Sequence, residues 1–457
     1  MTYRTLRSWL DRLQATDRLA VARPGISLDF TLAALAKRWD ARKAVLFPEP
    51  LGLDGRRHEI PVVSGLVSDR GWIAEAMGVE PGAVLDRFRA AAEQPLPWRE
   101  VADAPCQERI DRDPDLTTAL PIPKHNALDA GAYISAGLVI ARNPETGIQN
   151  VSINRLQITG PRRMGILILP RDLHHFFAAA EAAGEPLDIA VAVGVDPLTL
   201  LASQAILPID HDELGVAGAL HGAPLDVVKC ATNDVRVPAG AEIVIEGRLL
   251  PGVRETEGPF GEFPQYYGPA GEHPAIEVQA VTTCANPVFH TIVPAAMEHL
   301  LLGAIPREAT IAAHLQRTCP TVLDVHLSRG GVCRYHLYVK LRKTQEGQGR
   351  NVIMAAFAAH ADVKQVTVVD EDVDVHDPTA VEWAVATRFQ AGRDLFVVPR
   401  AQGSKLDPSA DNGVSDKLGL DATMPLDRDD FTYTVVHVPG EDDPGLDALL
   451  TDERYEF

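Results

Sequence analysis

The sequence predicts a multidomain protein of the α/β and α+β classes, and three observations lead to this prediction. The chain has 457 residues, which at about 150 residues per domain suggests three domains. Apolar residues make up 46% and charged residues 23%, which is ordinary globular usage and excludes wholesale disorder. The hydrophobic pattern also changes twice along the chain, so we expect domains over residues 1–120, 121–310 and 311–457.

The first domain is expected to alternate helices and strands. Apolar residues at helical spacing predict helices over 5–19, 30–39, 72–76 and 81–92. Short apolar runs bounded by turn residues predict strands over 44–47 and 60–64. The stretch 94–123 contains several prolines and many charges, and we interpret it as a linker into the next domain.

The second domain is expected to be rich in strands. Runs of Val and Ile predict strands over 134–142, 149–159, 164–169, 189–194, 227–230, 241–248, 275–284 and 288–293. Helical patterns appear between them over 174–183 and 197–205. Many strands separated by turn signals favour a β-barrel or a sandwich with inserted helices.

The third domain returns to the α/β pattern. We expect helices over 307–318, 351–359 and 379–388, and strands over 321–327, 334–340, 363–369 and 394–398. A loop rich in Gly, Ser, Asp and Pro follows over 400–413. The acidic tail from about residue 440 is expected to be a surface or interface arm.

Composition also restricts the partners of this protein. The formal net charge is −20, so we expect no nucleic acid and no membrane as partner. No apolar stretch approaches the ~18 residues of a membrane span, and charges among the first residues predict no secretion signal. The five cysteines contain no C-x-x-C pair, which favours a reducing compartment and predicts a cytoplasmic location.

The segment from Glu257 to Glu262 is the most unusual in the chain, because two carboxylates flank a Gly-Pro-Phe-Gly core. Proline and glycine make a helix implausible, so we interpret it as a shaped loop. Two carboxylates held close together raise the pKa of one of them, which then retains a proton to donate. The alternative is a turn with two solvated glutamates.

Arg155 ends a strand-like run in which it shares a face with Val151 and Ile153. An arginine on an apolar face needs an anion, which is either a buried structural carboxylate or a substrate carboxylate. Asp172 either caps the following helix or binds a metal. The acidic turn 209–213 is either solvated or supplies a hard-metal ligand.

Taken together, these segments resemble the UbiD family of decarboxylases, which use prenylated FMN. The matching stretches, in the family's order and approximate separation, are 150–155, 210–222, 225–233, 237–262 and 417–423. The resemblance implies an N-terminal α/β domain, a central split β-barrel domain that binds the flavin, and a C-terminal α/β domain that mediates dimerisation. It also implies a homodimer or a higher assembly of dimers.

The resemblance implies a catalytic set of one arginine and two acids. Arg155 would orient the substrate carboxylate, Glu257 would hold Arg155, and Glu262 would protonate the product carbon. The implied reaction is a non-oxidative, reversible decarboxylation of an α,β-unsaturated or (hetero)aromatic carboxylic acid, through a covalent adduct with prenylated FMN. A separate flavin prenyltransferase would supply that cofactor.

The resemblance also implies a divalent metal, usually Mn²⁺, with K⁺ nearby. The metal ligands would be Asn150, Asp172 and Glu213. Asp172 stands where the family has a histidine, and His174 would serve instead if the loop is shifted by two residues. The implied cofactor-binding positions are Asn150, Ser152, Ile153, Asn154, Arg155, Ala202, Ser203, Glu213 and Lys417. Of these, Lys417 matches the phosphate-binding lysine, and a lysine in a Gly/Asp-rich loop suits that role.

Two other functions are open at this stage. The first is a non-catalytic flavin-binding or assembly subunit related to the same family, against which the intact Arg155, Glu257 and Glu262 argue. The second is a flavin oxidoreductase, which the absence of any dinucleotide fingerprint disfavours. For a decarboxylase, the suitable substrates are a phenolic acid, a pyrrole or indole carboxylate, or a polyketide-type alkenoic acid. The pocket is expected to draw on residues 260–267 and 291–298.

Overall fold

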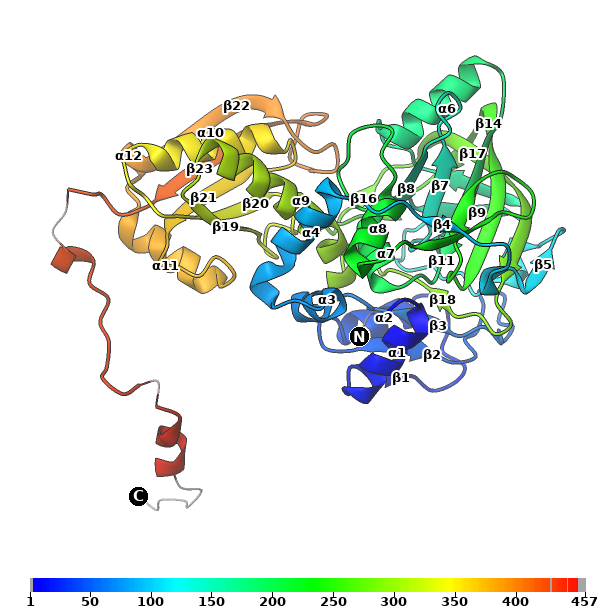
Figure 1. Cartoon of the computed structure of the whole chain (residues 1–457), viewed down its shortest axis with the longest axis horizontal. Helices are drawn as coiled ribbons and strands as arrows, with labels where there is room; N and C mark the ends of the chain where they lie inside the picture. Colours follow the sequence, from blue (N-terminus) through cyan, green and yellow to red (C-terminus); the bar gives the residue numbers. More distant parts are fainter. Residues whose placement is uncertain (1–2, 428–429, 442, 451–457) are drawn as a thin grey trace.

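The computed structural model describes residues 3–427, 430–441 and 443–450. It contains an N-terminal unit, a central unit and a C-terminal unit, from which an arm extends (Figure 1). Each unit combines helices with a sheet, so the predicted multidomain α/β fold is confirmed.

The N-terminal unit is built on a four-stranded sheet in the order β1 (Leu19–Val21), β2 (Ala44–Phe47), β3 (Val62–Ser64) and β18 (Phe289–His290). Its helices are α1 (Leu6–Ala15), α2 (Thr31–Arg38), α3 (Arg70–Met77) and α4 (Val84–Glu93), with a 3₁₀ turn at Pro81–Ala83. These elements follow the predicted pattern. β18 is short and pairs in parallel with β3, so the strand expected over 288–293 covers two residues and belongs to this sheet.

The central unit contains a nine-stranded sheet. Its path runs β6 (Tyr133–Ile134), β9 (Leu156–Gly160), β10 (Arg163–Ile166), β17 (Gly271–Thr283), β14 (Ile243–Glu257), β11 (Leu187–Val193), β7 (Leu138–Arg142) and β8 (Gln149–Ile153), with β5 (Arg109–Asp111) paired to β17. A small sheet joins β13 (Arg236–Pro238), β12 (Asp226–Lys229) and β4 (Arg99–Glu100), and β15 (Phe260–Gly261) pairs with β16 (Tyr267–Gly268). The split barrel itself stays a prediction.

Helices of the central unit are α5 (Leu116–Ala119), α6 (Asp172–Ala182), α7 (Pro197–Ala202) and α8 (Glu213–His221). The sequence missed α8, because all nine of its residues are buried and it has no polar face to reveal a helical period. The interpretation of 94–123 as a linker was wrong in part. It contains β4, β5, α5 and a 3₁₀ turn at Pro105–Gln107, and both strands pair with strands of the central unit.

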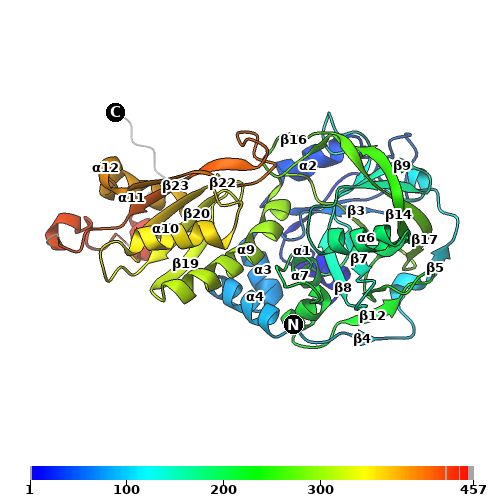
Figure 2. The same ribbon diagram turned by 90° about the horizontal axis from the view of Figure 1, so that it is seen from above.

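The C-terminal unit has a five-stranded sheet in the order β19 (Val322–Leu327), β20 (His336–Leu341), β21 (Gln365–Asp370), β23 (Val414–Ala422) and β22 (Leu395–Gln402). Its helices are α9 (Met297–Thr318), α10 (Gln348–Ala359), α11 (Pro378–Arg388) and α12 (Ala391–Asp394). α9 and α10 pack on one face of the sheet and α11 on the other. α9 begins ten residues before the helix expected from 307 and lies between the central and C-terminal units (Figure 2).

The arm beyond β23 includes 3₁₀ turns at Asp430–Tyr433 and Pro444–Leu449 and runs away from the body (Figure 1). Its exposed side chains include Val436, Leu449 and Leu450. Part of the predicted acidic arm, residues 451–457, lies outside the described residues. Within the described ranges, the helices all lack the length and apolar character needed to cross a membrane.

Candidate active site

Arg155 lies between two acids in the central unit. It follows β8, Glu257 is the last residue of β14, and Glu262 follows β15. Nη2 of Arg155 is 2.7 Å from Oε2 of Glu257, and Nη1 contacts Oε1 of Glu262. The three side chains are 8%, 0% and 12% exposed, respectively. The structure therefore brings together the three predicted catalytic residues. Arg155 and Glu257 are more than 100 positions apart in the sequence.

Two sequence interpretations of this region need correction. The strand that was expected over 149–159 divides into β8 and β9, so Arg155 lies at the turn and strand alternation does not set its direction. The segment from Glu257 to Glu262 is not a loop throughout, because β14 extends nine residues past its expected end at Arg248 and Glu257 closes it. The anion beside Arg155 in the described structure is protein carboxylate rather than solvent.

Aromatic side chains cover the ion cluster. The Phe260 ring centroid is 5.4 Å from Cζ of Arg155 and 4.3 Å from the ring of Tyr133. The Tyr133 hydroxyl lies 3.0 Å from Oε1 of Gln157, which also accepts a hydrogen bond of 3.0 Å from the amide of Gly258. These contacts hold the segment after Glu257 in place. Sequence reasoning missed Tyr133, which directly precedes the strand expected over 134–142, and Gln157, which lies in the strand expected over 149–159, because neither belongs to a motif.

Burial affects the pKa values of Glu262 and Arg155 in opposite directions. It raises the pKa of Glu262, and the negative charge of Glu257 raises it further, although Arg155 lowers it. Burial by itself lowers the pKa of Arg155, but the two carboxylates more than reverse this, so Arg155 stays a cation. Oε1 of Glu257 and Nε of Arg155 are buried without a hydrogen-bond partner. The site thus combines a fixed cation, an acid with a raised pKa and buried polar atoms without hydrogen-bond partners.

A second cluster lies at the other end of β8. Asn150 Nδ2 donates to Oε1 of Glu213 at 3.0 Å, and the Val151 amide donates to Oε2 at 2.7 Å. Glu213 is the first residue of α8, whose N-cap Asp212 accepts from the amide of Leu214. β8 therefore connects the pair of predicted metal ligands to the catalytic arginine within six residues.

The third predicted ligand, Asp172, acts on Glu213 of this pair through its charge. Burial raises the pKa of Glu213 to about 8, and the charge of Asp172 contributes to the rise. Asp172 begins α6, but the N-cap is Arg171 and no side chain caps the helix, so its carboxylate is not used as a cap. His174 is exposed on α6, where its charge acts on Glu181. Of the two predicted alternatives, Asp172 is the one whose charge acts on Glu213, and its role as a ligand stays a prediction.

This donor set fits a hard divalent cation. Glu213 is a buried carboxylate with only neutral donors on it, and a cation would stabilise its charged form. Asn150 offers a carbonyl oxygen of the kind that such cations take. In the described ranges, no three His, Cys, Asp or Glu side chains form a metal-ligating group. The predicted set does not need one, since it has two carboxylates and an amide.

The remaining predicted cofactor positions lie near these clusters, with one exception. Ser152 donates to Oδ1 of Asn154 at 2.8 Å, and the Ser203 hydroxyl donates to the Leu200 carbonyl at 2.7 Å. Ile153 ends β8, and Ala202 ends α7 directly before Ser203. These residues lie on β8, on the turn that follows it and at the end of α7.

Lys417 is the exception. It lies on β23, not in the Gly/Asp-rich loop that the sequence suggested, and it is 3% exposed. Its Nζ donates to the carbonyls of Ala361 and Val363, both at 2.8 Å, and burial lowers its pKa. The structure therefore holds Lys417 by contacts inside the C-terminal unit.

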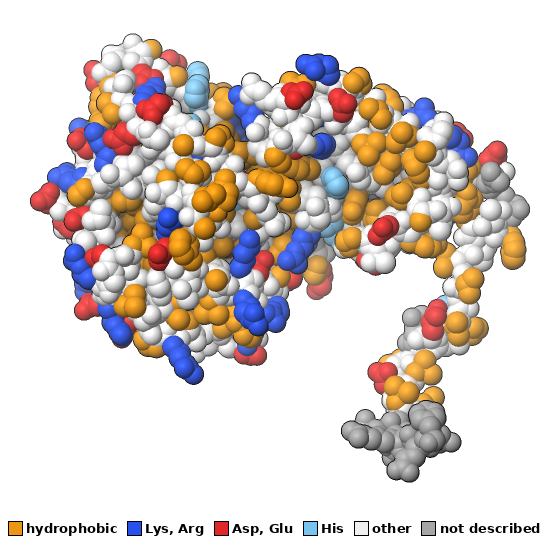
Figure 3. All heavy atoms as spheres, turned by 180° about the vertical axis from the view of Figure 1, so that it is seen from behind, with side chains coloured by type: hydrophobic (Ala, Val, Ile, Leu, Met, Phe, Trp, Pro, Cys, Tyr) orange, Lys and Arg blue, Asp and Glu red, His pale blue; other side chains and the backbone are white. Residues whose placement is uncertain are grey.

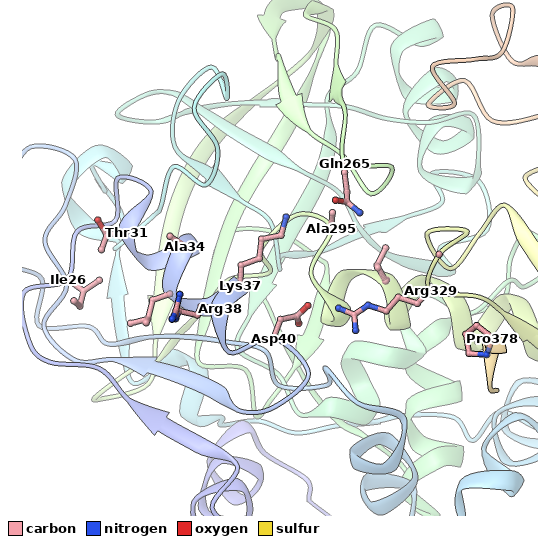
Figure 4. Close-up of a pocket in the computed structure, with 13 residues that line it drawn as sticks. Ile26, Thr31, Ala34, Lys37, Arg38, Asp40, Gln265, Ala295, Arg329 and Pro378 are labelled. Carbon is pink, nitrogen blue, oxygen red and sulfur yellow. The ribbon is translucent and has the colours of Figure 1, made fainter. Parts of the chain in front are cut away.

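A cleft opens beside Glu262, where the three units meet. Its volume is about 1330 Å³. Lys37 and Asp40 come from the N-terminal unit, Gln265 from the turn after Glu262, and Arg329 from the C-terminal unit. Figure 4 shows Lys37 directed towards Gln265 and Arg329 directed towards Asp40. Among the residues that line this cleft, Gln265 comes closest in sequence to the acids, three positions after Glu262.

Comparison with known proteins identifies the family. Models of 3-octaprenyl-4-hydroxybenzoate carboxy-lyase match over the whole body of the chain: the N-terminal domain over residues 10–92, the Rift-related domain over 99–297 and the C-terminal domain over 300–422. A similar curated protein is the anhydromevalonate phosphate decarboxylase of Methanothermobacter thermautotrophicus. It is 39% identical, over 92% of this chain and 97% of that protein.

The chain belongs to the UbiD family. The predicted resemblance is confirmed, and with it the assignment as a carboxy-lyase. The UbiD-class enzyme HmfF from Pelotomaculum thermopropionicum, solved in complex with FMN, is 51% identical with a TM-score of 0.95, over 98% of this chain and 100% of that chain. The 3,4-dihydroxybenzoic acid decarboxylase AroY of Klebsiella pneumoniae, solved without ligands, is 29% identical with a TM-score of 0.90, over 98% and 99% of the two chains. This UbiD-family protein therefore shares the whole layout of those enzymes.

Proposed function

We propose that this UbiD-family protein catalyses the non-oxidative, reversible decarboxylation of an α,β-unsaturated or (hetero)aromatic carboxylic acid with prenylated FMN. The observation that carries the proposal is the buried cluster in which Arg155 touches both Glu257 and Glu262. Such a cluster places a cation that can bind a carboxylate in direct contact with an acid that can donate a proton. Solved relatives that bind FMN or prenylated FMN support the choice of cofactor.

The roles follow from the contacts. An incoming carboxylate replaces Glu262 at Nη1 of Arg155, while Glu257 keeps Nη2 and holds the guanidinium. The bond from the substrate carbon to CO₂ breaks, and its electron pair stays on the carbon side. Glu262, whose pKa burial raises, then donates its proton to that carbon. In the reverse direction Glu262 removes the proton.

The cofactor would be held by residues of two clusters. The bound prenylated flavin supplies the electron sink. Asn150, Asp172 and Glu213 are proposed to bind Mn²⁺, and Ala202 and Ser203 to contact the flavin and K⁺. Lys417 is proposed to bind the phosphate by exchanging one of its carbonyl acceptors.

We also propose a homodimer or an assembly of dimers, formed through the C-terminal unit. Exposed apolar side chains there include Trp383, Leu395 and Val397, and Figure 3 shows apolar side chains gathered on this unit. β22 is an edge strand of its sheet. A dimeric form of the relative HmfF has been solved. The supply of cofactor by a flavin prenyltransferase and a cytoplasmic location remain predictions.

Replacing Glu262 tests the proposal. The protein is co-expressed with a flavin prenyltransferase, and cofactor content is measured by mass spectrometry together with CO₂ release from a panel of unsaturated and aromatic acids. For Glu262→Gln we expect prenylated FMN to stay bound while turnover falls by about 10²-fold or more. Glu272→Gln is the matched control, because Glu272 is an exposed acid that accepts from Thr256.

Two results would contradict the proposal. Full turnover in Glu262→Gln would remove the assigned proton donor. A wild-type protein that binds prenylated FMN but releases CO₂ from no acid of the panel would favour the non-catalytic subunit.

A further inference from the structure

Two arginines beside the active site have no acidic partner. Arg334 is 8% exposed, and its Nε and Nη1 have no hydrogen-bond partner. Arg307 on α9 donates from Nη1 to the Gly303 carbonyl at 2.5 Å, and its Nε is also buried without a partner. Among the described residues, neither guanidinium forms an ion pair within 4.0 Å. Both cations are therefore open to an anion that the chain itself does not provide.

Physical chemistry makes this arrangement costly unless a ligand completes it. Arginine does not lose its proton in proteins, so burial without an anion leaves an uncompensated charge. The two guanidinium groups also act on one another: burial lowers the pKa of Arg307, and the charge of Arg334 lowers it further. The negative charge of Asp362 raises the pKa of both Arg307 and Arg334, but Asp362 lies beyond ion-pair distance from either arginine.

His299 adds a directed donor to the two arginines. Its Nδ1 accepts a hydrogen bond of 3.1 Å from the Ala295 amide, so in the neutral ring the proton sits on Nε2. The ring is neutral, because burial and the charges of Arg334 and Arg307 lower its pKa to about 3. The Nε2–H group is then a hydrogen-bond donor for an anion.

The group lies next to the proton donor. Phe263 directly follows Glu262, and its ring centroid is 4.4 Å from Cζ of Arg334 and 6.5 Å from the ring of His299. The charge of Glu262 acts on Arg334. Gly303 makes room for the guanidinium, since a Cβ there would lie 2.4 Å from Nη2 of Arg334. A substrate held at Arg155 and Glu262 is thus close to a second set of cationic donors.

We propose that Arg307, Arg334 and the Nε2–H of His299 bind a second anionic group of the substrate. The preferred substrate is then a dianion: one carboxylate is lost at Arg155, and the other group stays on the product. This inference rests on the decarboxylase function proposed above and narrows its substrate class. The second group is an oxyanion, either a carboxylate or a phosphate, because a guanidinium pair recognises both.

Two further observations support a dianion. The adjoining cleft, with Gln265, Leu300 and Gly330 in its lining, has about 1330 Å³ and accommodates a small acid. The curated relatives named anhydromevalonate phosphate decarboxylase have, by that name, a substrate that carries a phosphate besides the group lost as CO₂. A second anionic group is therefore compatible with the chemistry of related enzymes.

Matched substrates test the proposal on the holoenzyme made with a flavin prenyltransferase. Aromatic dicarboxylates with five- and six-membered rings are each compared with their monomethyl esters, and anhydromevalonate phosphate with its dephosphorylated form. We expect kcat/KM for one of the dianions to exceed that for its monoanion by roughly 30-fold or more. A preference in the first pairs identifies a carboxylate, and in the last pair a phosphate.

Variants test which residues produce the preference for the dianion over the monoanion. Arg334→Met and Arg307→Met are each expected to lower kcat/KM for the dianion by roughly 30-fold or more, while kcat/KM for the monoanion changes little. Arg317→Met is the matched control. Arg317 is on the same helix and also donates to the carbonyl four residues before it, at 3.3 Å from Ala313, but it is exposed. Thermal unfolding and flavin content are measured on every variant.

The outcomes separate this inference from the proposed function. Equal turnover of monoanions and dianions by the wild-type enzyme would overturn the second site and leave the decarboxylase intact. If the enzyme releases CO₂ from none of the acids tested, the result would instead contradict the proposed function. Equal losses on both substrates in Arg334→Met and Arg307→Met, with lower unfolding temperatures, would show that the arginines only support the fold. If neither variant folds, the wild-type comparison alone decides.

Discussion

At the scale of single residues, Arg155 connects the acid proposed to hold it, Glu257, to the acid proposed to donate the proton, Glu262. Its two terminal nitrogens contact Glu257 and Glu262, and all three side chains are nearly buried. In such surroundings a charged carboxylate is costly, and burial raises the pKa of Glu262 although Arg155 lowers it. The raised pKa of Glu262 agrees with this division of roles.

The raised pKa of Glu262 predicts a pH dependence. Burial raises it above the ordinary glutamate value, and the protonated form is the one that donates. We therefore expect kcat for decarboxylation to hold at low pH and to fall as the pH rises through the raised pKa. Measuring kcat from about pH 5 to about pH 9, which spans the range of raised carboxyl pKa values in catalytic acids, checks this. A kcat that increases with pH over this range would exclude Glu262 as the proton donor.

At the scale of elements, β8 and α8 position two of the proposed metal ligands. β8 presents Asn150 at one end and leads to Arg155 at the other, and α8 begins at Glu213. The N-cap Asp212 fixes the start of α8, and its second oxygen accepts from Nε1 of Trp98 at 2.8 Å. A defined helix start therefore sets where Glu213 meets Asn150.

This arrangement predicts that metal and flavin leave together. Treatment of the holoenzyme with a chelator is expected to remove Mn²⁺ and release the flavin into the filtrate, because Asn150, Asp172 and Glu213 would hold the flavin phosphate only through the proposed metal. Glu213→Gln should weaken Mn²⁺ binding by about 10-fold or more, measured by metal titration. Asp226→Asn is a suitable control, since Asp226 pairs with Arg99 at the surface. Unchanged Mn²⁺ affinity in Glu213→Gln would exclude Glu213 as a ligand.

At the scale of the whole molecule, α9 joins the three units. Its Glu298 accepts hydrogen bonds of 2.8 Å from the amides of Gly65 and Leu66 in the N-terminal unit. Its Glu308 binds Arg70 of α3 and accepts from the Leu327 amide of β19 at 2.7 Å. The helix thus fixes the sides of the cleft through two buried carboxylates.

The contacts of Glu308 with Arg70 and with the Leu327 amide predict that the stability of the fold decreases in acid. Burial alone would raise its pKa, but Arg70 and His326 bring the pKa from 4.5 down to about 2. Its contribution to stability is present above about pH 4.5 and is lost as the pH falls from 4.5 towards 2. Glu308→Gln is expected to lower the free energy of unfolding by about 3–5 kcal/mol at neutral pH. Urea unfolding at pH 7 and pH 3 tests this, and equal stability of variant and wild type at pH 7 would contradict it.

The sequence by itself determined the class of the fold, the succession of most elements and the identity of the catalytic and metal-binding candidates. Strand and helix periods are local properties, so β2 was predicted at its observed bounds. Glu257 and Glu262 were identified as catalytic candidates through the resemblance to the UbiD family, because their spacing alone left a solvated turn as an alternative. Fully buried elements were harder. α8 has no polar face, and the alternation of β23 was hidden among its Gly and Asp residues.

Only the tertiary structure decided which side chains meet. The pairing of β18 with β3 joins residues more than 200 positions apart. Of the two acids on Arg155, Glu257 ends β14 and Glu262 follows β15. Arg307 and Arg334 meet at Gly303 because α9 packs against the C-terminal sheet. No local pattern encodes these contacts, because they depend on how the apolar faces of separate elements bury one another. The open cationic site beside Glu262 is a product of that packing.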